Sequence, residues 1–495
     1  MNNALVVIAA FFAIAVSLGV YARRGRTMSL EQWSLGGRGF GAIFVFLLMA
    51  GEIYTTFTFL GGSGWAYGQG APAFYILGYM LVAYTMSYFL LPAIWRYAQQ
   101  QRLVSQADFF VRKYDSRPLG VLVALVSVAA CVPYLVLQLK GLGIIVSEAS
   151  YGSISPTAAV WSGAAALVVF VVASGVRGSA WTAVLKDIMI LAAALFAGIY
   201  LPVHYYGGYR AMFTAIEAVK PTFFVLPSRG LSTSWFISTV VLTGFGFYMW
   251  PHSFATVYTA RNEHVFRKNA VIMPLYLLML VFIFLAGFAA VLQVPGLHGA
   301  DADLSLLRIV KLAMNPWLVG FMGAAGVLTA LVPGSMLLVT STTIIAQNIY
   351  RPLAGPDADD RRISIIARSA VPVVALTAVW LTLRGGSAIV PLLLMGYSLV
   401  TQLMPALLLS LGDRPRTSAA AAFAGILAGE LVVAYVTISG SSLPALLPAA
   451  PQAIQDLNVG IVALIVNVVV VAVVTPFTAR PRIAVLPETL VMSDR

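Results

Sequence analysis

Long apolar segments recur along the whole chain, and this feature constrains the fold most strongly. A helix needs about 20 mainly apolar residues to cross a bilayer, and thirteen segments of the 495-residue sequence reach that length. They lie near 3–22, 40–66, 72–95, 118–147, 155–174, 179–203, 231–255, 269–293, 316–348, 364–383, 387–410, 418–438 and 457–478. Several exceed the minimum, so tilted, kinked or broken helices are expected. The pattern predicts an all-α, polytopic membrane protein of about thirteen transmembrane helices.

The composition supports this fold class and excludes others. The sequence is 60% hydrophobic and only 10% charged, whereas a soluble domain carries about 25% charged residues. So few charges cannot cover a surface in water, which excludes a soluble enzyme, a disordered protein and a cytosolic nucleic-acid-binding protein. The net charge of +12 is therefore assigned to basic cytoplasmic loops rather than to a nucleic-acid partner. Because one cysteine, Cys131, and four scattered histidines are present, we expect neither an internal disulfide nor a metal cluster.

The positions of Lys and Arg predict the orientation in the membrane. If the N-terminus lies outside, the cytoplasmic loops hold 22 of these residues and the outside loops hold 6, in agreement with the positive-inside rule. Arg23, Arg24 and Arg26 follow the first apolar segment instead of preceding it, so we expect a retained helix and not a signal peptide. The C-terminus then lies in the cytoplasm, and a bacterial inner membrane is the expected location. The outside stretch 209–219 is expected to form a short interfacial helix.

Two of the segments contain residues that interrupt a membrane helix. In the second segment, residues 50–56 (AGEIYTT) contain a carboxylate, Glu52, near the middle of the membrane. Inserting a charged side chain there costs about 2.5–3.5 kcal/mol. In the seventh segment, residues 244–252 (GFGFYMWPH) combine glycines with a proline. A proline kink with glycine packing accounts for one such segment alone. Two breaks five helices apart indicate an inverted-repeat transporter that holds its substrate near the midplane, between the breaks.

The breaks also suggest how the chain is divided. Residues 1–30 are expected to form an additional N-terminal helix. The transport core is expected over 31–410, with its two halves at about 40–203 and 231–410. Residues 411–495 are expected to form two more helices and a short cytoplasmic tail.

Several sequence motifs resemble those of the sodium:solute symporter family, and within it the bacterial monocarboxylate-permease branch. The matching stretches are 33–38 (WSLGGR), 51–59 (GEIYTTFTF), 133–139 (PYLVLQL), 184–189 (VLKDIM), 250–253 (WPHS), 330–333 (ALVP) and 348–351 (NIYR). The resemblance implies a five-plus-five inverted repeat of the leucine-transporter type, with one helix before the repeat and two after it. That number agrees with the thirteen segments counted from hydropathy alone.

The resemblance also implies where a coupling cation would bind. Gly51 and Tyr54 match the carbonyl donors of the family's usual sodium site, Val332 matches a third, and Ser335 matches one of two hydroxyl ligands. The second hydroxyl position holds Met336, and a thioether is a poor ligand for a hard cation.

The helix that carries Lys186 also departs from the family pattern in a way that disfavours sodium binding. Ala183 stands where many sodium-coupled members have an acid, and Lys186, followed by Asp187, lies three positions later on the same helical face. A buried lysine can occupy the place of a sodium ion and can cycle protons. Proton coupling or facilitated transport is therefore favoured, and sodium coupling stays open as the alternative.

Polar residues near the two breaks form the expected substrate site for a small anion. Amides at the N-terminus of a half-helix attract a carboxylate, and Lys140 adds positive charge. Packing of the aromatic rings, a core role for His252 and structural ion pairs for the charged residues are the competing interpretations. The expected substrate-binding residues are Glu52, Thr55, Thr56, Tyr134, Gln138, Lys140, Tyr248 and His252.

These observations predict a secondary-active transporter that takes up small organic solutes, most simply monocarboxylates such as lactate, pyruvate or acetate, by alternating access. A sodium-driven symporter for an amino acid, a vitamin or another solute is the alternative within transport. A membrane-embedded solute sensor is the alternative from another class, whereas an enzyme is not expected. The oligomeric state and the role of Glu430, a carboxylate in a later segment, stay open.

Overall fold

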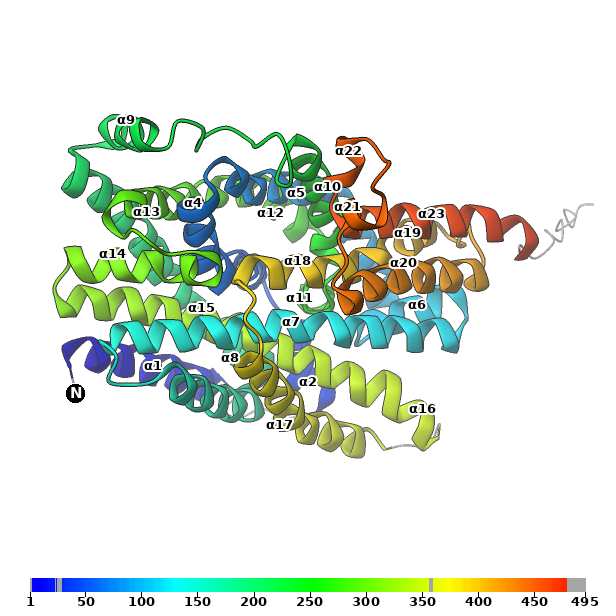
Figure 1. Cartoon of the computed structure of the whole chain (residues 1–495). Coiled ribbons are helices and arrows are strands. Elements are labelled where there is room, and N and C mark those ends of the chain that lie inside the picture. The colour runs from blue at the N-terminus through cyan, green and yellow to red at the C-terminus, as the bar shows by residue number, and fades with distance from the viewer. Residues whose placement is uncertain (1, 23, 25–28, 356–358, 479–495) are drawn as a thin grey trace, which may run out of the picture.

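The computed structural model describes residues 2–22, 24, 29–355 and 359–478, and these residues form a bundle of helices (Figure 1). Ten helical stretches are long and apolar enough to cross a membrane. They are 3–22 (α1), 71–100 (η2 and α5), 117–149 (α7), 156–206 (α8), 264–293 (α12 and α13), 316–354 (α15, η5 and α16), 360–384 (α17), 389–410 (α18, η6 and α19), 419–439 (α20) and 459–478 (α23).

Helix α8 (Pro156–Tyr206) supplies two crossings instead of one. At about 1.5 Å per residue, 51 helical residues would extend far beyond a hydrocarbon core of about 30 Å. The chain reverses at Gly175, where φ is 59° and ψ is −159°. Phe170, before this point, packs against Gly19, and Thr182, after it, donates to the carbonyl of Ala15 at 3.0 Å. Both parts of α8 therefore reach the same end of α1 (Asn3–Ala22).

The two remaining crossings are the broken helices. The first consists of α3 (Ala42–Gly51), a π-helical stretch η1 (Phe57–Gly62) and α4 (Ser63–Gln69), with non-helical residues between α3 and η1. The second consists of α10 (Thr233–Gly246), a 3-10 turn η3 (Phe247–Met249) and α11 (Pro251–Thr259), separated by the extended residue Trp250. With α8 counted twice and these two added, the described residues contain the thirteen predicted crossings, so the predicted fold class is confirmed.

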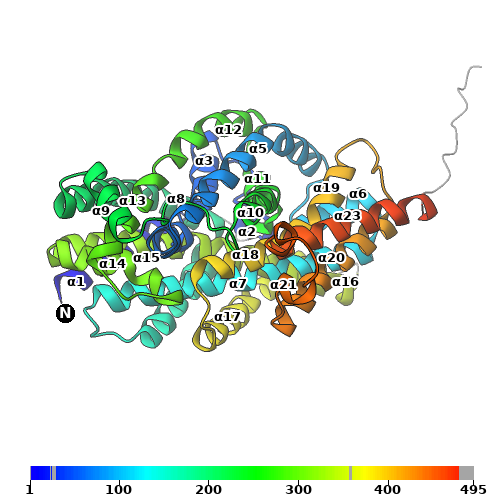
Figure 2. The same cartoon turned by 45° about the horizontal axis from the view of Figure 1, so that its top comes forward.

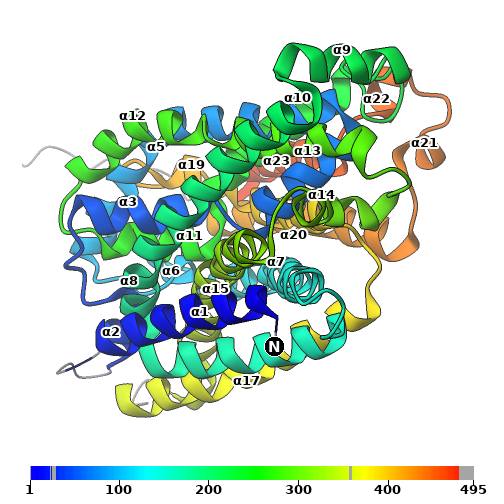
Figure 3. The same cartoon turned by 90° about the vertical axis from the view of Figure 1, so that its left-hand side faces the viewer.

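Helix α15 (Pro316–Ile344) lies at the centre of the bundle. Nearly every side chain from Val319 onward is buried, and the helix packs against α1, α7 (Arg117–Ala149) and α8. In Figure 3, α15 and α7 are enclosed by the other helices, with α1, α8 and α17 (Asp360–Arg384) on one side. The core of the bundle therefore forms around α15 and the helices packed on it, α1, α7 and α8.

The peripheral elements match their predicted positions along the chain. The predicted helix at 209–219 is α9 (Tyr209–Val219), which buries Met212 and Ile216 and lies at the edge of the bundle (Figure 1). Helices α20 (Ala419–Ser439) and α23 (Val459–Thr478) pack side by side after the core (Figure 2). The predicted cytoplasmic tail 479–495 lies outside the described residues, as do Arg23 and Arg26. The orientation of the termini stays a prediction.

The reversal in α8 gives a test of the fold. A Cβ atom on Gly175 would lie 2.6 Å from the carbonyl oxygen of Trp33, in a backbone conformation that is essentially restricted to glycine. We expect Gly175→Ala to lower the melting temperature of the purified protein clearly, with a loss of stability of about 2 kcal/mol.

Gly207→Ala is the matched control, because Gly207 also has a positive φ, of 76°, but nothing lies within 4 Å of its Cβ position. An equal effect of the two substitutions would contradict a close approach of α8 to Trp33.

Candidate functional site

The first break holds a buried ammonium group. Lys186, on the second part of α8, is fully buried, and its Nζ donates to the carbonyl oxygen of Tyr54 at 3.4 Å. Gly51 lies close to both Lys186 and Val332. A Cβ atom added to Gly51 would be 3.6 Å from Lys186 Nζ and 3.6 Å from Val332 Cγ1. The ammonium thus lies among residues that the resemblance assigns to a cation site.

Asp187 is the counter-ion of Lys186. Its Oδ1 lies 2.7 Å from Nζ, and both side chains are at most 4% exposed. A single buried charge is expensive, and an opposite charge at this distance offsets part of that cost. The ring of Tyr276, on α12 (His264–Leu277), packs edge-on against Tyr54 at 4.9 Å, and Tyr54 donates to the Tyr276 carbonyl at 2.9 Å. The pair therefore lies in a closed, ordered environment.

Ser335 bonds to one residue of this cluster and to one residue outside it. Its Oγ donates to the Val332 carbonyl at 2.6 Å and lies 2.6 Å from Oγ of Ser179. Ser179 precedes Lys186 by two helical turns, so the contact ties α15 to the helix that carries the ammonium. Of the predicted cation-site residues, the structure brings together Gly51, Tyr54, Lys186, Asp187 and Val332, and places Ser335 beside them.

Glu52 joins the two broken helices. Its carboxylate follows the last turn of α3 and accepts hydrogen bonds from Ser253 Oγ and, at 3.3 Å, from Thr256 Oγ1, both on α11. Ser253 Oγ also lies 3.3 Å from the carbonyl oxygen of Phe247, in the second break. The predicted cost of this acid is thus offset by hydroxyl donors, and the two breaks lie side by side.

Thr56 and Gln138 connect the first break to α7. Thr56 Oγ1 donates to Oε1 of Gln138 at 2.8 Å, and a Cβ atom on Gly141 would lie only 2.6 Å from Thr56 Cβ. Gln138 Nε2 is buried and has no hydrogen-bond partner. The Thr55 hydroxyl accepts from the amide of Phe57 at 3.1 Å, which fixes the start of η1.

Aromatic rings surround the second break. The ring of Tyr134, one turn before Gln138, lies 4.9 Å from the ring of Trp250 and 5.5 Å from the imidazole of His252. Tyr397, on α18 (Ile389–Val400), packs on Trp250 at 5.3 Å. His252 is 1% exposed, and its Nδ1 has no hydrogen-bond partner.

Tyr248 lies in the second break itself, within η3, where it is buried with its ring 5.0 Å from that of Phe247. Lys140, by contrast, occupies other surroundings. Lys140 Nζ donates to the carbonyl of Ser387 at 2.8 Å and to Asp303 Oδ2 at 3.3 Å. Asp303, in η4 (Gly299–Leu304), also accepts from the amide of Ile389 at 3.0 Å, where α18 begins. Lys140 and Asp303 therefore hold the start of α18 in place. Lys140 shares no polar partner with Gln138, which bonds to Thr56.

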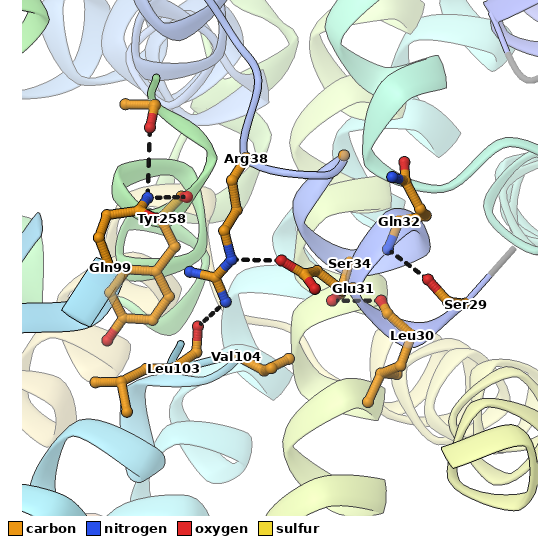
Figure 4. Close-up of polar contacts among 12 residues, drawn as sticks. Ser29, Leu30, Glu31, Gln32, Ser34, Arg38, Gln99, Leu103, Val104 and Tyr258 are labelled. Carbon is orange, nitrogen blue, oxygen red and sulfur yellow. Dashed lines mark hydrogen bonds and ion pairs between the residues drawn. The ribbon is translucent and has the colours of Figure 1, made fainter. Parts of the chain in front are cut away.

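The residues of the 33–38 motif close the other end of the core, which is the predicted cytoplasmic end. Arg38 donates to Glu31 at 2.5 Å and to the carbonyl of Leu103 at 2.6 Å (Figure 4). Next to the motif, Phe40 exchanges backbone hydrogen bonds of 3.0 Å with Thr259, the last residue of α11, and with Arg261. Arg38 thus ties helix α2 (Leu30–Leu35) to the segment that contains Leu103, and Phe40 ties the start of the first broken helix to the end of the second.

Sequence reasoning missed the partners that complete the site. Ser253 and Trp250 lie in a motif used for the resemblance, but Thr256, Asp303 and Tyr397 carry no local pattern that marks them. Within the described residues, no group of three or more His, Cys, Asp or Glu side chains that would hold a metal ion is found.

Glu52→Gln tests the joint between the two breaks. We expect the initial rate of solute uptake into proteoliposomes to fall at least about tenfold at equal protein abundance, because an amide replaces a carboxylate that accepts two hydrogen bonds. Glu148→Gln is the control, since Glu148 accepts from Lys311 at 2.7 Å outside this site. Wild-type uptake by the Glu52 variant would exclude a transport role for this carboxylate.

Comparisons with known proteins agree with this architecture. The model of the "Sodium:solute symporter family" matches residues 33–429. The uncharacterized symporter YhjB of Bacillus subtilis (strain 168) is 58% identical over 484 residues, which are 98% of this chain and 99% of that protein. The "Monocarboxylate transport permease protein" of Rhizobium johnstonii is 27% identical over 387 residues, covering 76% of this chain and 77% of the relative.

A solved structure shows the same fold. A Na+-coupled sialic acid symporter in a substrate-bound, outward-open state superposes with a TM-score of 0.79 at 15% sequence identity. The match covers 97% of this chain and 98% of the symporter chain.

Proposed function

Because the chain belongs to the sodium:solute symporter family, we propose that it takes up small monocarboxylates by secondary-active transport. One observation carries this proposal: the two broken helices meet at a buried cluster of polar and aromatic side chains that includes an unused amide donor, Gln138 Nε2. Discontinuous helices place substrates at such a junction. The relative that transports monocarboxylates supports the same solute class.

The second break supplies the electrostatics that favour an anion. Helix α11 begins at Pro251, directly after the extended residue Trp250. The first amides of a helix have no partner within it, and the helix dipole adds partial positive charge at this end. His252 and Ser253 carry such amides. A carboxylate beside them would gain both hydrogen bonds and favourable charge.

We further propose that a proton gradient drives uptake and that the ammonium of Lys186 takes the place of the sodium ion. The ammonium donates to the Tyr54 carbonyl and pairs with Asp187, so it occupies the position beside that carbonyl that a sodium ion would otherwise take. Release and uptake of its proton during the transport cycle would couple uptake to a proton gradient. Met336, which offers no hard oxygen ligand, is buried nearby on α15.

The substrate class is tested by competition. We expect unlabelled monocarboxylates to inhibit uptake of a labelled monocarboxylate at least about tenfold better than their uncharged amides, because a charge-assisted hydrogen bond is about twice as strong as a neutral one. The measurement is the half-inhibitory concentration of each acid and its amide in proteoliposomes. Equal inhibition by both would show that the negative charge is not recognised.

Ion replacement tests the coupling. Uptake should continue when choline replaces sodium, and it should rise as the outside pH falls. Lys186→Ala should abolish accumulation, because Asp187 then remains buried without its partner.

Lys311→Ala is the matched control for this substitution. Lys311 also bonds a carboxylate, that of Glu148, at 2.7 Å, but it is partly exposed. Strict dependence of wild-type uptake on sodium, with no response to a proton gradient, would overturn proton coupling. It would favour the alternative, a sodium-driven symporter.

A further inference from the structure

Four buried polar atoms at the second break and on the facing part of α7 have no hydrogen-bond partner among the described residues. They are Gln138 Nε2, His252 Nδ1, Trp250 Nε1 and Tyr248 Oη. Buried polar atoms in proteins are hydrogen-bonded in the great majority of cases, so these unpaired atoms need an explanation. A bound molecule that pairs with Gln138 and His252, which are each only 1% exposed, provides it for two of them.

The side-chain amide of Gln138 has a fixed orientation, so its Nε2 group donates in one direction. Because its Oε1 accepts from Thr56 Oγ1 at 2.8 Å, the amide group is held with Nε2 on the opposite side. An amide nitrogen only donates. It therefore fits an acceptor such as a carboxylate oxygen.

His252 presents a group that suits a different oxygen. Its imidazole lies against two rings, with centroids 5.5 Å from Tyr134 and 5.8 Å from Trp250. A neutral imidazole has one donor and one acceptor nitrogen. It can pair with a hydroxyl group, which both donates and accepts, or donate to a carbonyl oxygen.

The two groups lie on either side of the same residue. Tyr134 and Gln138 are four residues apart on α7, so their side chains are neighbours, with Cβ atoms about 5–6 Å apart. His252 packs on the ring of Tyr134 from α11. Both groups therefore border the Tyr134 side chain, and we take a molecule of a few carbon atoms to bridge them.

We propose that the substrate is a short monocarboxylate with an oxygen atom on its second carbon, that is, a 2-hydroxy or 2-oxo acid. Its carboxylate accepts from Gln138 Nε2, and its 2-oxygen pairs with His252. This assignment rests on the proposed function and narrows it, since acetate and propionate lack the second oxygen. The rings of Trp250 and Tyr397, 5.3 Å apart, close the cluster and favour a short carbon chain.

Competition with propionate tests the substrate class, because propionate has the three carbons of lactate without the 2-oxygen. We expect lactate and pyruvate to inhibit uptake of labelled lactate at least about tenfold better than propionate, since a buried group made to bond a substrate oxygen discriminates against an analogue without it. Equal inhibition by lactate and propionate would overturn this inference and leave the proposed function intact. Lack of inhibition by every monocarboxylate would instead overturn the proposed function.

Two substitutions assign the roles of the residues. His252→Phe keeps a ring for packing but removes both nitrogens, so it should reduce the preference for lactate over propionate to about one without weakening propionate. Gln138→Leu should weaken both acids by a similar factor. His204→Phe is the control, because His204 stacks on Tyr200 at 5.1 Å, away from the breaks.

A second histidine variant separates recognition from packing. His252→Asn retains hydrogen-bonding atoms and should preserve part of the preference for lactate at a comparable melting temperature. If His252→Phe weakens lactate and propionate equally, or if neither histidine variant changes their ratio, the assignment of the 2-oxygen to His252 is wrong.

Discussion

Every backbone group that a broken helix frees inside a membrane must find a partner within the protein, and the structure around both breaks follows from this constraint. In the first break, the Tyr54 carbonyl accepts from Lys186, and the Ile53 carbonyl accepts from Thr58 at 2.8 Å. In the second, the Phe247 carbonyl lies within hydrogen-bond distance of Ser253. Thr58 and Ser253 satisfy carbonyls five and six residues away within their own broken helices, whereas Lys186 comes from α8, 132 residues away. The first break therefore depends on a distant helix as well as on its own neighbours.

The buried charged side chains around the two breaks must also be compensated, because an isolated charge is costly away from water. Lys186 and Asp187 compensate one another, and the carboxylate of Glu52 is stabilised by hydroxyl groups. The positive charge beside the unwound residues 52–56 belongs to a side chain of the protein, and the proposed coupling starts from that observation.

Local patterns in the sequence predicted the crossings and both breaks, because hydropathy, proline and glycine act on the residues next to them. The position of Lys186 against the first break was also expected, although only the resemblance pointed to it. The role of Lys140 was not predictable, because its partner Asp303 is 163 residues away and lies in a short loop helix. The bond between Ser335 and Ser179, 156 residues apart, likewise depends on how α8 folds back at Gly175. Helix packing, rather than any local motif, decides such pairs.

Asp303 serves two partners with one oxygen atom, since Oδ2 accepts both from Lys140 and from the first amide of α18. Lys140 in turn holds the Ser387 carbonyl, in the segment that leads into α18. The three bonds therefore share two side chains, and loss of the Asp303 carboxylate alone would free both the Lys140 ammonium and the Ile389 amide. The link between α7, η4 and the start of α18 is thus one connected unit, and its members are expected to lose their partners together rather than independently.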